Sequence, residues 1–302
     1  MHEWAAEIEV GEPVVRRLLA EQFELEPASL RLFAEGWDNS VWVADGTWAF
    51  RFPRRRIALP GVERELAVLP RLAPLLPVPV PLPRFVGRPS ERYPWPFFGA
   101  RLLPGREPES AAPAEDDRGE LASALGSFLR VLHAPELAAA VDPDRRLPVD
   151  FNRRADMTAR VPRTREQLAA LERLGLWRAP RLVERLLAEA EQLPPPGAEA
   201  VVHGDLHFRH VLVEDGAVTG VIDWGDVCRA DPAVDLQLVW SFLPPAAREP
   251  FLLAYGPVSD EQLLRARVLA LSLGAALAAY GHHESLPQVE LEALAGLRRA
   301  AR

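Results

Sequence analysis

Carboxylates and histidines gather in one short stretch of the chain, residues 201–226, which reads VVHGDLHFRHVLVEDGAVTGVIDWGD. Two apolar runs with β propensity, 211–213 and 218–222, flank Asp215-Gly216, a pair that favours a hairpin turn. Chemically active side chains stand on both sides of this hairpin: His203, Asp205, His207 and His210 before it, Asp223 and Asp226 after it. Because a hairpin can bring its entry and exit to one edge, the stretch predicts a functional site.

The carboxylates of this stretch suggest two kinds of chemistry. Asp205 follows an apolar run and lies between two histidines, so it can accept a proton from a hydroxyl or ligate a metal. Asp223 ends the second strand, where its carboxylate can project from the sheet. Carboxylates without cysteine ligands suit a hard cation such as Mg²⁺. We expect His203 to be a core histidine bonded to a backbone carbonyl, and His207 to be either a loop residue or a ligand.

The composition is that of an ordinary soluble protein with a sizeable core. The chain has 302 residues, of which 48% are hydrophobic and 26% charged. A net charge of -8 argues against nonspecific nucleic-acid binding. The single cysteine, Cys228, excludes an intramolecular disulfide. No signal peptide is visible, and the longest apolar run, 268–280, is too short to span a bilayer. We therefore expect a cytoplasmic protein without a membrane or nucleic-acid partner; its oligomeric state is left open.

Period-two patterns dominate the first third of the chain. They predict strands at 30–34, 40–44, 47–52, 84–87 and 96–103, together with helices at 3–25 and 61–72. In the third strand Arg51 points away from the face that Phe50 and Phe52 share. The chain contains no lysine, so any phosphate site that uses a cation in this region has to use arginine.

Helical periodicity dominates the rest of the chain. It predicts helices at 121–132, 163–174, 179–193, 232–242, 260–281 and 287–301, after a polar loop at 106–117. The expected architecture is α+β with two lobes: a small β-rich lobe over 1–103, with a five-stranded sheet, and a larger helical lobe over 104–302. The hinge between them is expected near Leu103.

The motifs of the central stretch resemble those of the aminoglycoside and macrolide phosphotransferases, which have the protein-kinase-like fold. Members of this family carry His-Gly-Asp-Leu, three variable residues and Asn, followed by Ile-Asp-Trp or Ile-Asp-Phe; here the segments read HGDLHFRH and VIDWGD. Trp37-Asp38-Asn39 resembles the family's nucleotide loop, and Arg51 stands where its phosphate-contacting Lys does. The segment 62–65 resembles the helix that supplies a partner Glu, and Leu103-Pro104-Gly105 resembles the hinge. The resemblance covers about residues 30–243.

The resemblance implies phosphoryl transfer from ATP or GTP to a hydroxyl of a small molecule, with Mg²⁺. Asp205 would orient the hydroxyl and accept its proton, and Asp223 would hold the metal. Arg51, oriented by Glu65, would bind the nucleotide phosphates. The remaining nucleotide contacts are expected from the loop and the hinge: Gly36, Asn39, Ser40, Ala100, Leu102 and Leu103.

Two residues depart from the family pattern. Arg51 replaces Lys, and a planar guanidinium does not bind phosphate as an ammonium does. His210 replaces the metal-binding Asn, as it does in the macrolide branch, so it either becomes the second metal ligand or contacts a phosphate. On the acceptor side we expect Asp226 and Trp240. Acidic residues there would suit an aminoglycoside, and aromatic ones a macrolide or another bulky alcohol.

Three other functions are compatible with the same residues. A metabolic kinase for choline, homoserine or a sugar would keep the reaction and change the acceptor. A nucleotide-binding pseudokinase would explain both departures without activity. A metal-dependent hydrolase would use the His/Asp cluster for Zn²⁺, although no second cluster of ligands appears in the sequence. Stoichiometric Zn²⁺ without nucleotide binding would favour the hydrolase.

Overall fold

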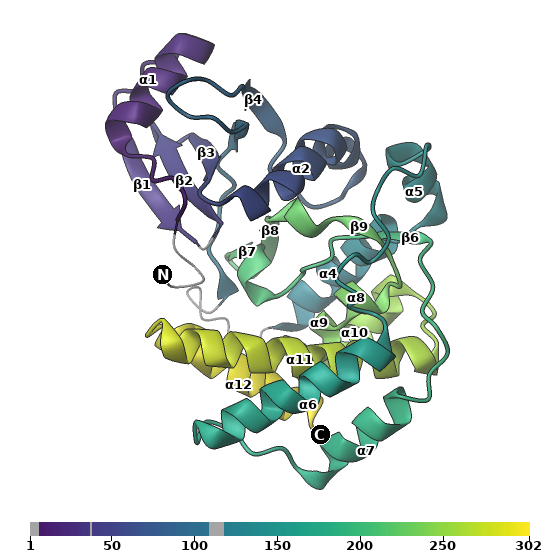
Figure 1. The fold of residues 1–302 in the computed structure, drawn as a ribbon. Coiled ribbons are helices and arrows are strands. Elements are labelled where there is room, and N and C mark those ends of the chain that lie inside the picture. Colours follow the sequence, from purple (N-terminus) through teal and green to yellow (C-terminus); the bar gives the residue numbers. More distant parts are fainter. Residues whose placement is uncertain (1–5, 37, 109–117) are drawn as a thin grey trace. The chain divides into compact units, whose positions relative to one another are not determined.

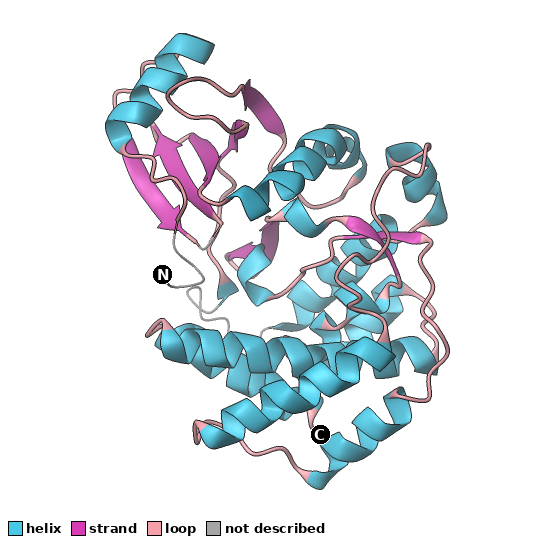
Figure 2. Ribbon diagram, viewed as in Figure 1, coloured by secondary structure: helices cyan, strands magenta, loops and turns pink. Residues whose placement is uncertain are grey.

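The structure is a computed structural model that describes residues 6–36, 38–108 and 118–302. Its contacts divide the chain into two compact units. The first comprises residues 1–75, 79–103 and 223–226; the second comprises 76–78, 104–222 and 227–302. The first unit is built around a sheet and the second is mainly helical (Figures 1 and 2).

The first unit contains a five-stranded antiparallel sheet in the order β1-β2-β3-β5-β4. Its strands are β1 Leu30–Glu35, β2 Asn39–Ala44, β3 Trp48–Pro53, β4 Pro83–Gly87 and β5 Phe97–Arg101. Asp45 and Gly46 join β2 to β3 with φ values of 50° and 62°, the left-handed conformation that a tight hairpin turn requires. Arg51 pairs with Val41 on one side and Phe98 on the other, so β3 holds it in the middle of the sheet.

Two helices bury the opposite faces of this sheet. Helix α1, Glu12–Phe23, contributes Leu18 and Leu19 to a core with Phe50 and other aromatic residues. Helix α2, Leu59–Leu72, contributes residues that pack with Phe98 and Ala100 of β5. Because successive residues of a strand point to opposite faces, Phe97 and Phe98 belong to different cores.

Helix α1 is shorter than the predicted helix over 3–25. It begins after Gly11 with Pro13 in its first turn, where a missing N–H is tolerated, and residues 6–11 are not helical. Residues 1–5 lie outside the described part. The helix ends at Phe23, because the next residue, Glu24, has a φ of 54°, which is incompatible with a right-handed helix.

The segment 223–226 packs against α2 within the first unit. It contains the short 3-10 helix η5, Trp224–Asp226. A Cβ atom added to Gly61 of α2 would lie 3.3 Å from the Cα atom of Gly225, so the two backbones come close because neither residue has a side chain. Two further 3-10 helices flank α2: η1 Arg56–Ala58 and η2 Ala73–Leu75.

Helices and two short sheets form the second unit. The helices are α4 Arg118–Leu132, α5 Pro135–Val141, α6 Met157–Arg173, α7 Arg181–Ala190, α8 Ala233–Leu236, α9 Leu238–Ser241, α10 Pro245–Tyr255, α11 Asp260–His283 and α12 Pro287–Ala300. The two-stranded sheets pair β6 Ala200–Val202 with β9 Cys228–Ala230, and β7 Val211–Glu214 with β8 Ala217–Val221. A 3-10 helix, η4 Phe208–His210, precedes β7.

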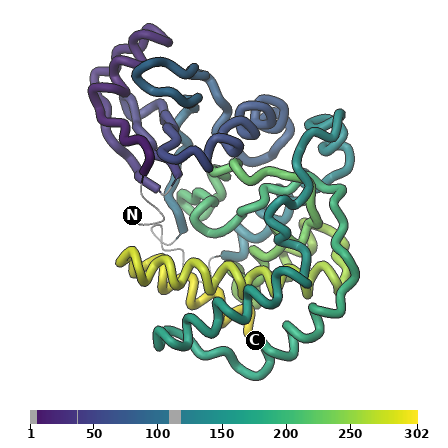
Figure 3. Tube along the Cα trace, viewed as in Figure 1, coloured from purple at the N-terminus to yellow at the C-terminus, as the bar shows by residue number. Residues whose placement is uncertain are grey.

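Helix α11 forms the centre of the helical unit. It packs along α12 and α6 (Figure 3). It also contacts α8 and α9. Its length and apolar composition would allow it to cross a membrane, but more than half of its apolar window is buried inside the unit. A core helix of a soluble protein passes the same test, so this helix is weak evidence for a membrane span.

Three elements of the helical unit were not predicted from sequence. Helix α5 is only seven residues long, α10 contains Pro250, and β9 has three residues, so none of them gives a sustained periodic pattern. Helix α6 begins at Met157, earlier than the predicted 163, because Asp156 caps it by accepting a hydrogen bond from the Thr158 N–H at 3.0 Å. The helix predicted at 232–242 divides at Gln237 into α8 and α9.

Candidate active site

A buried carboxylate fixes the backbone of the loop that carries Asp205. Asp235 accepts hydrogen bonds from the N–H groups of His203 (2.7 Å) and Gly204 (3.1 Å). Its Oδ2 also lies 3.1 Å from Nε2 of His133, whose other ring nitrogen lies 3.0 Å from the Tyr255 hydroxyl. Burial alone would raise the pKa of Asp235, but His133 and His203 outweigh it and lower the pKa. Asp235 therefore remains ionised and holds the loop.

His203 links the two ends of the hairpin segment. Its Nδ1 accepts a hydrogen bond from the Asp205 N–H at 3.2 Å, so Nε2 carries the proton and donates to the Ile222 carbonyl at 2.9 Å. Burial lowers the pKa of His203, which favours this neutral form. The prediction that this histidine bonds a backbone carbonyl is confirmed. The His203 ring thus joins the backbone of Asp205 to the residue that precedes Asp223.

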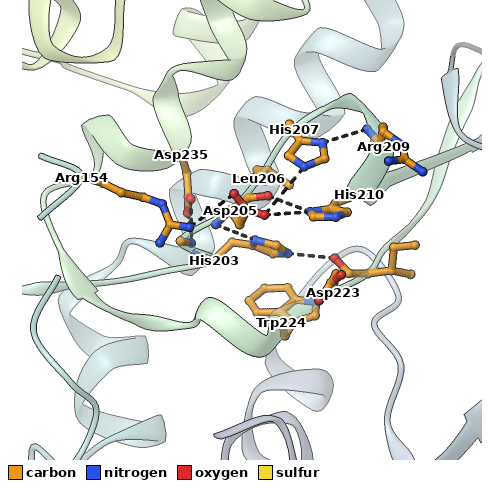
Figure 4. Close-up of polar contacts among 12 residues, drawn as sticks. Arg154, His203, Asp205, Leu206, His207, Arg209, His210, Asp223, Trp224 and Asp235 are labelled. Atoms are coloured by element: carbon orange, nitrogen blue, oxygen red, sulfur yellow. Dashed lines mark hydrogen bonds and ion pairs between the residues drawn. The ribbon is translucent and has the colours of Figure 1, made fainter. Parts of the chain in front are cut away.

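Three cationic or potentially cationic groups surround the carboxylate of Asp205 (Figure 4). The Arg154 guanidinium lies 3.5 Å from Oδ1. Oδ2 lies 3.7 Å from Nε2 of His207 and 3.9 Å from Nδ1 of His210. The Asp205 side chain is 33% exposed, whereas its neighbour Leu206 is buried. The loop therefore presents one accessible carboxylate on an anchored backbone.

Asp205, His207 and His210 offer ligand atoms within 4.8 Å of one another, a spacing that could hold a metal ion. Their hydrogen bonds oppose this use. Nδ1 of His207 accepts from the Arg209 N–H at 3.2 Å, which leaves the proton of the neutral ring on Nε2, the atom that faces Asp205. Nδ1 of His210 bonds the Asp205 carbonyl at 2.7 Å and so also carries a proton. Of the two imidazole rings, therefore, only that of His210 could offer a lone pair, on Nε2, beside the Asp205 carboxylate without a change of tautomer.

Arg51 forms the centre of a second cluster, within the first unit. Its Nη1 donates to Glu65 Oε1 at 2.9 Å and its Nη2 donates to Asp223 Oδ1 at 2.8 Å. With its amide oxygen turned toward this guanidinium, Asn39 accepts from Nε at 3.2 Å and from Nη2 at 2.9 Å. The planar fork of an arginine is therefore shared among three side chains, which a single ammonium cannot do.

Burial controls the charges in this cluster. It raises the pKa of Glu65 to about 7, opposed by Arg51 and reinforced by Asp223. Burial alone would lower the pKa of Arg51, but the carboxylates of Asp223 and Glu65 raise it above its ordinary value. Oε2 of Glu65 is buried and has no hydrogen-bond partner among the described residues. Arg51 therefore remains charged, and Glu65 is the group whose protonation changes near neutral pH.

The backbone around Asp223 has an unusual conformation. Asp223 has a φ of 64°, which is uncommon for a residue with a side chain and often marks a functional position. The Trp224 N–H donates to Glu65 Oε1 at 3.0 Å, and Arg64 donates to the Gly225 carbonyl at 2.8 Å. Arg64 also lies 3.8 Å from a carboxylate oxygen of Asp226. Helix α2 thus holds the whole segment through two neighbouring side chains.

The residues predicted to contact nucleotide lie on β2, β5 and the ends of neighbouring strands. Gly36 and Asn39 close the loop between β1 and β2 through a backbone hydrogen bond of 2.9 Å. Ser40 is buried, and its hydroxyl has no partner within the described ranges. Ala100 is buried at the end of β5, and the Leu102 N–H donates to the Thr47 carbonyl at 2.8 Å; Leu103 follows it and is partly exposed. Trp37 of the predicted loop lies outside the described residues.

Trp240, predicted to contact the acceptor, lies between two arginines of neighbouring helices. The guanidinium of Arg248 stands 4.3 Å from the ring centroid, and that of Arg267 stands 4.8 Å from it. Arg267 in turn donates to the Ala300 carbonyl at 2.7 Å. These contacts involve α9, α10, α11 and α12.

Arg154 was not identified from sequence as a site residue. It lies 51 positions before Asp205, in an irregular loop before α6, and no pattern connects the two residues. Glu65 and Asn39 both bind the Arg51 guanidinium. The sequence predicted this partnership for Glu65 but not for Asn39. Proximity of this kind depends on tertiary packing.

The sequence profile of the phosphotransferase enzyme family (APH) matches residues 29–269 of the chain. The chain belongs to this family. The match covers both clusters described above, and it confirms the resemblance seen in the HGDLHFRH and VIDWGD motifs.

Solved structures of aminoglycoside and macrolide phosphotransferases share the fold over nearly the whole chain. The GDP complex of aminoglycoside 2'-phosphotransferase-IIIa is 21% identical with a TM-score of 0.70, covering 97% of this chain and 99% of that one. The macrolide 2'-phosphotransferase MphH from Brachybacterium faecium is 25% identical with a TM-score of 0.62, covering 94% and 97%. The predicted α+β, protein-kinase-like fold class is confirmed.

A curated relative matches only part of the chain. The uncharacterized protein YcbJ of Bacillus subtilis (strain 168) is 48% identical over 44 residues. This match spans 14% of the present chain and 14% of the relative. It carries no information on activity.

Proposed function

We propose that this member of the phosphotransferase enzyme family transfers the γ-phosphoryl group of a nucleoside triphosphate to a hydroxyl of a small molecule. The arrangement of Arg51 between Glu65 and Asp223 supports the proposal most strongly. It brings together, from β3, α2 and the segment after β8, three side-chain types that phosphoryl transfer needs for binding phosphates and a metal.

Asp205 is the proposed catalytic base. Its partly exposed carboxylate stands on a loop fixed through Asp235 and His203, so its position is set before substrate binds. During transfer the acceptor O–H would give its proton to Asp205 while the oxygen forms a bond to the γ-phosphorus. The bond between that phosphorus and the bridging oxygen breaks, and the nucleoside diphosphate leaves.

Arg51 would bind the nucleotide phosphates, with Glu65 and Asn39 orienting its guanidinium. Phosphate oxygens and the Asp223 carboxylate would compete for the same donor, Nη2. The nucleotide is proposed to lie along Gly36, Asn39 and Ser40, with its base near Ala100, Leu102 and Leu103. Asp226 and Trp240 remain proposals for the acceptor side.

The donor set fits Mg²⁺. Asp223 supplies a hard carboxylate oxygen and is 42% exposed, and Nε2 of His210 could act as a weaker second ligand or contact a phosphate. Held by these residues, the ion would supply positive charge to neutralise the transferred phosphoryl group. A zinc hydrolase is less well supported, because His207 would have to change its tautomer before its Nε2 could bind a metal, which leaves one imidazole ligand in the cluster.

Two similar solved structures hold different nucleotides. One similar structure is described as a GDP complex and another as an ADP-bound aminoglycoside phosphotransferase. We therefore propose ATP or GTP as the phosphoryl donor. A metabolic alcohol remains an alternative to an antibiotic, because family membership does not define the acceptor.

The two carboxylates can be tested by substitution. We expect Asp205→Asn to abolish phosphate transfer from ATP or GTP while preserving stabilisation of the fold by nucleotide. Asp223→Asn should instead remove the Mg²⁺ dependence of that stabilisation. Transfer would be assayed against panels of aminoglycosides, macrolides and metabolic alcohols, and binding by thermal unfolding with and without Mg²⁺. Wild-type protein that neither binds nucleotide nor transfers phosphate would refute the proposed function.

A further inference from the structure

An irregular loop between α5 and α6 reaches the carboxylate of Asp205 from within the same unit. Asp150 folds this loop back on itself: its two carboxylate oxygens accept from the N–H groups of Arg154 (2.7 Å) and Ala155 (2.8 Å). Arg265, buried in α11, donates to the Ala155 carbonyl at 2.9 Å and also to the Pro194 carbonyl. These bonds fix the backbone from which the Arg154 side chain extends to Asp205.

Another arginine contacts this loop from the helix that follows it. Arg160, in the first turn of α6, directs its Nε to the Arg154 carbonyl at 3.3 Å and its Nη2 to the Asn152 carbonyl at 3.5 Å. Its contacts are long and involve neutral oxygens only. Within the described ranges no carboxylate lies at ion-pair distance from Arg160, so its positive charge lacks a counterion.

The surroundings of Arg160 make this charge unfavourable in the structure as it stands. Burial, together with the neighbouring charges of Arg163 and Arg154, lowers the pKa of Arg160 to about 10, while the charge of Asp150 opposes this shift. Of the four acidic residues in the loop, Asp150 and Asp156 lie nearest to Arg160 in the chain, and they do not remove this shift. Asp150 is occupied by backbone N–H groups, and Asp156 caps α6 and pairs with Arg153 at 2.5 Å.

A polycationic acceptor would be poorly suited to such surroundings. Its ammonium groups would approach residues 150–160, which carry three guanidinium groups and two carboxylates, both of the carboxylates already engaged within the stretch. An anionic group on the acceptor would supply the ion-pair partner that Arg160 does not have among the described residues, since a guanidinium binds carboxylate or phosphate oxygens in a bidentate manner. The loop also exposes two apolar side chains, Val149 and Phe151.

We propose that the acceptor of this phosphotransferase is an alcohol bearing an anionic group, with Arg160 and Arg154 binding the anion while the hydroxyl meets Asp205. This inference rests on the proposed function and narrows its acceptor class. Arg154 is shared between the anion and the carboxylate of Asp205, so it would also orient the acceptor. Arg160 is a specificity residue that acts on binding.

A matched set of acceptors tests the charge preference directly. Benzyl alcohol, 4-(hydroxymethyl)benzoate, 4-(hydroxymethyl)phenyl phosphate and 4-(aminomethyl)benzyl alcohol share one ring and one hydroxyl and differ in charge. With wild-type enzyme, Mg²⁺ and ATP or GTP, we expect kcat/KM for an anionic acceptor to exceed that for the cationic one about tenfold or more, as one charge-assisted hydrogen bond provides. The carboxylate and phosphate members separate the two kinds of anion.

Substitutions assign the preference to Arg160. Arg160→Gln should raise KM for the preferred anionic acceptor about tenfold, and Arg160→Lys should restore much of the loss because it keeps the charge. The same change at Arg173, an exposed arginine in the last turn of α6, is the control and should leave both constants unchanged. An equal KM increase for neutral and anionic acceptors would show that Arg160 only supports the fold, and would overturn the inference.

The inference and the proposed function fail in different ways. Transfer to aminoglycosides or to the cationic probe in preference to the anionic ones would refute the anionic acceptor while confirming phosphotransferase activity. Absence of nucleotide binding, nucleotide hydrolysis and transfer in the wild-type protein would instead refute the proposed function itself.

Discussion

At the scale of single residues, the most informative feature is how the protein uses an arginine where the family resemblance places a lysine. Arg51 reaches Glu65, Asp223 and Asn39 with different nitrogens of one guanidinium. A lysine has one ammonium on a flexible chain and cannot make these contacts together. The side chains around this position therefore suit an arginine better than a lysine.

Arg51→Lys should consequently impair the protein. We expect a higher KM for nucleotide, a lower kcat and a loss of about 1–3 kcal/mol in the free energy of unfolding, because buried partners lose charge-assisted hydrogen bonds. Nucleotide titrations and urea unfolding measure these effects. Arg16→Lys is the control, since Arg16 pairs with Glu12 on the exposed face of α1. Unchanged stability and nucleotide binding in Arg51→Lys would contradict the interpretation that three side chains depend on the guanidinium of Arg51.

Glu65 predicts a pH dependence of stability. Burial raises its folded-state pKa to about 7, from an ordinary value of 4.5. Between these values the folded protein holds a proton that the unfolded chain has released, so this contribution is complete below pH 4.5 and disappears as the pH rises through 7.

Glu65→Gln should flatten this dependence. Between about pH 5.5 and 8, the wild-type free energy of unfolding should fall by up to about 2 kcal/mol more than that of the variant. Urea unfolding at both pH values provides the measurement. Parallel pH profiles of the two proteins would show that Glu65 keeps its charge in the folded state through its pairing with Arg51.

At the scale of elements, close contact between helices is set by glycines. In α4, a Cβ on Gly126 would lie 2.4 Å from the Phe251 carbonyl oxygen of α10 and 3.1 Å from the Ala254 side chain. Gly119 of the same helix has nothing within 4 Å of such a Cβ. One glycine is therefore required by packing, and the other is not.

Alanine substitutions at these two glycines should have opposite effects. Gly126→Ala should destabilise the fold by about 1–3 kcal/mol, because α10 has to move away from α4. Gly119→Ala should be neutral or stabilise by up to about 1 kcal/mol through helix propensity. Thermal or urea unfolding compares the pair. A destabilised Gly119→Ala with a normal Gly126→Ala would mean that α4 and α10 do not pack as described.

At the scale of the whole molecule, the burial of the long apolar helix α11 bears on whether the chain stays in solution without detergent. Apolar residues such as Val268, Leu271 and Ala275 are buried against neighbouring helices. Exposure of this surface to lipid would require the helical unit to open.

We therefore expect the expressed chain to remain in the supernatant after ultracentrifugation without detergent. It should also bind little of a dye that reports exposed apolar surface, because α11 lies inside the unit. Fractionation and dye fluorescence make the measurement, with urea-unfolded protein as the positive reference. Recovery only in detergent would contradict the packing of α11. The cytoplasmic location and the domain bounds 1–103 and 104–302 remain predictions.

Local sequence determined much of the architecture. The alternation in 40–52 was enough to predict the hairpin of β2 and β3, and the spacing of apolar residues predicted α4, α11 and α12. These patterns are readable because each element buries one face, which imposes a period on its own residues. The paired motifs around Asp205 and Asp223 indicated the family for a similar reason, since the reacting groups lie close together in the chain.

Tertiary structure decided which distant side chains meet. Asn39 joins Arg51 through strand pairing, and Arg154 reaches Asp205 across 51 residues. Arg160 has no carboxylate at ion-pair distance among the residues that the structure describes. No periodic pattern records such contacts, because each depends on loop conformation and on how whole elements pack. The sequence by itself determined the fold class and the candidate chemistry, and only the folded chain revealed the charges that surround the proposed base.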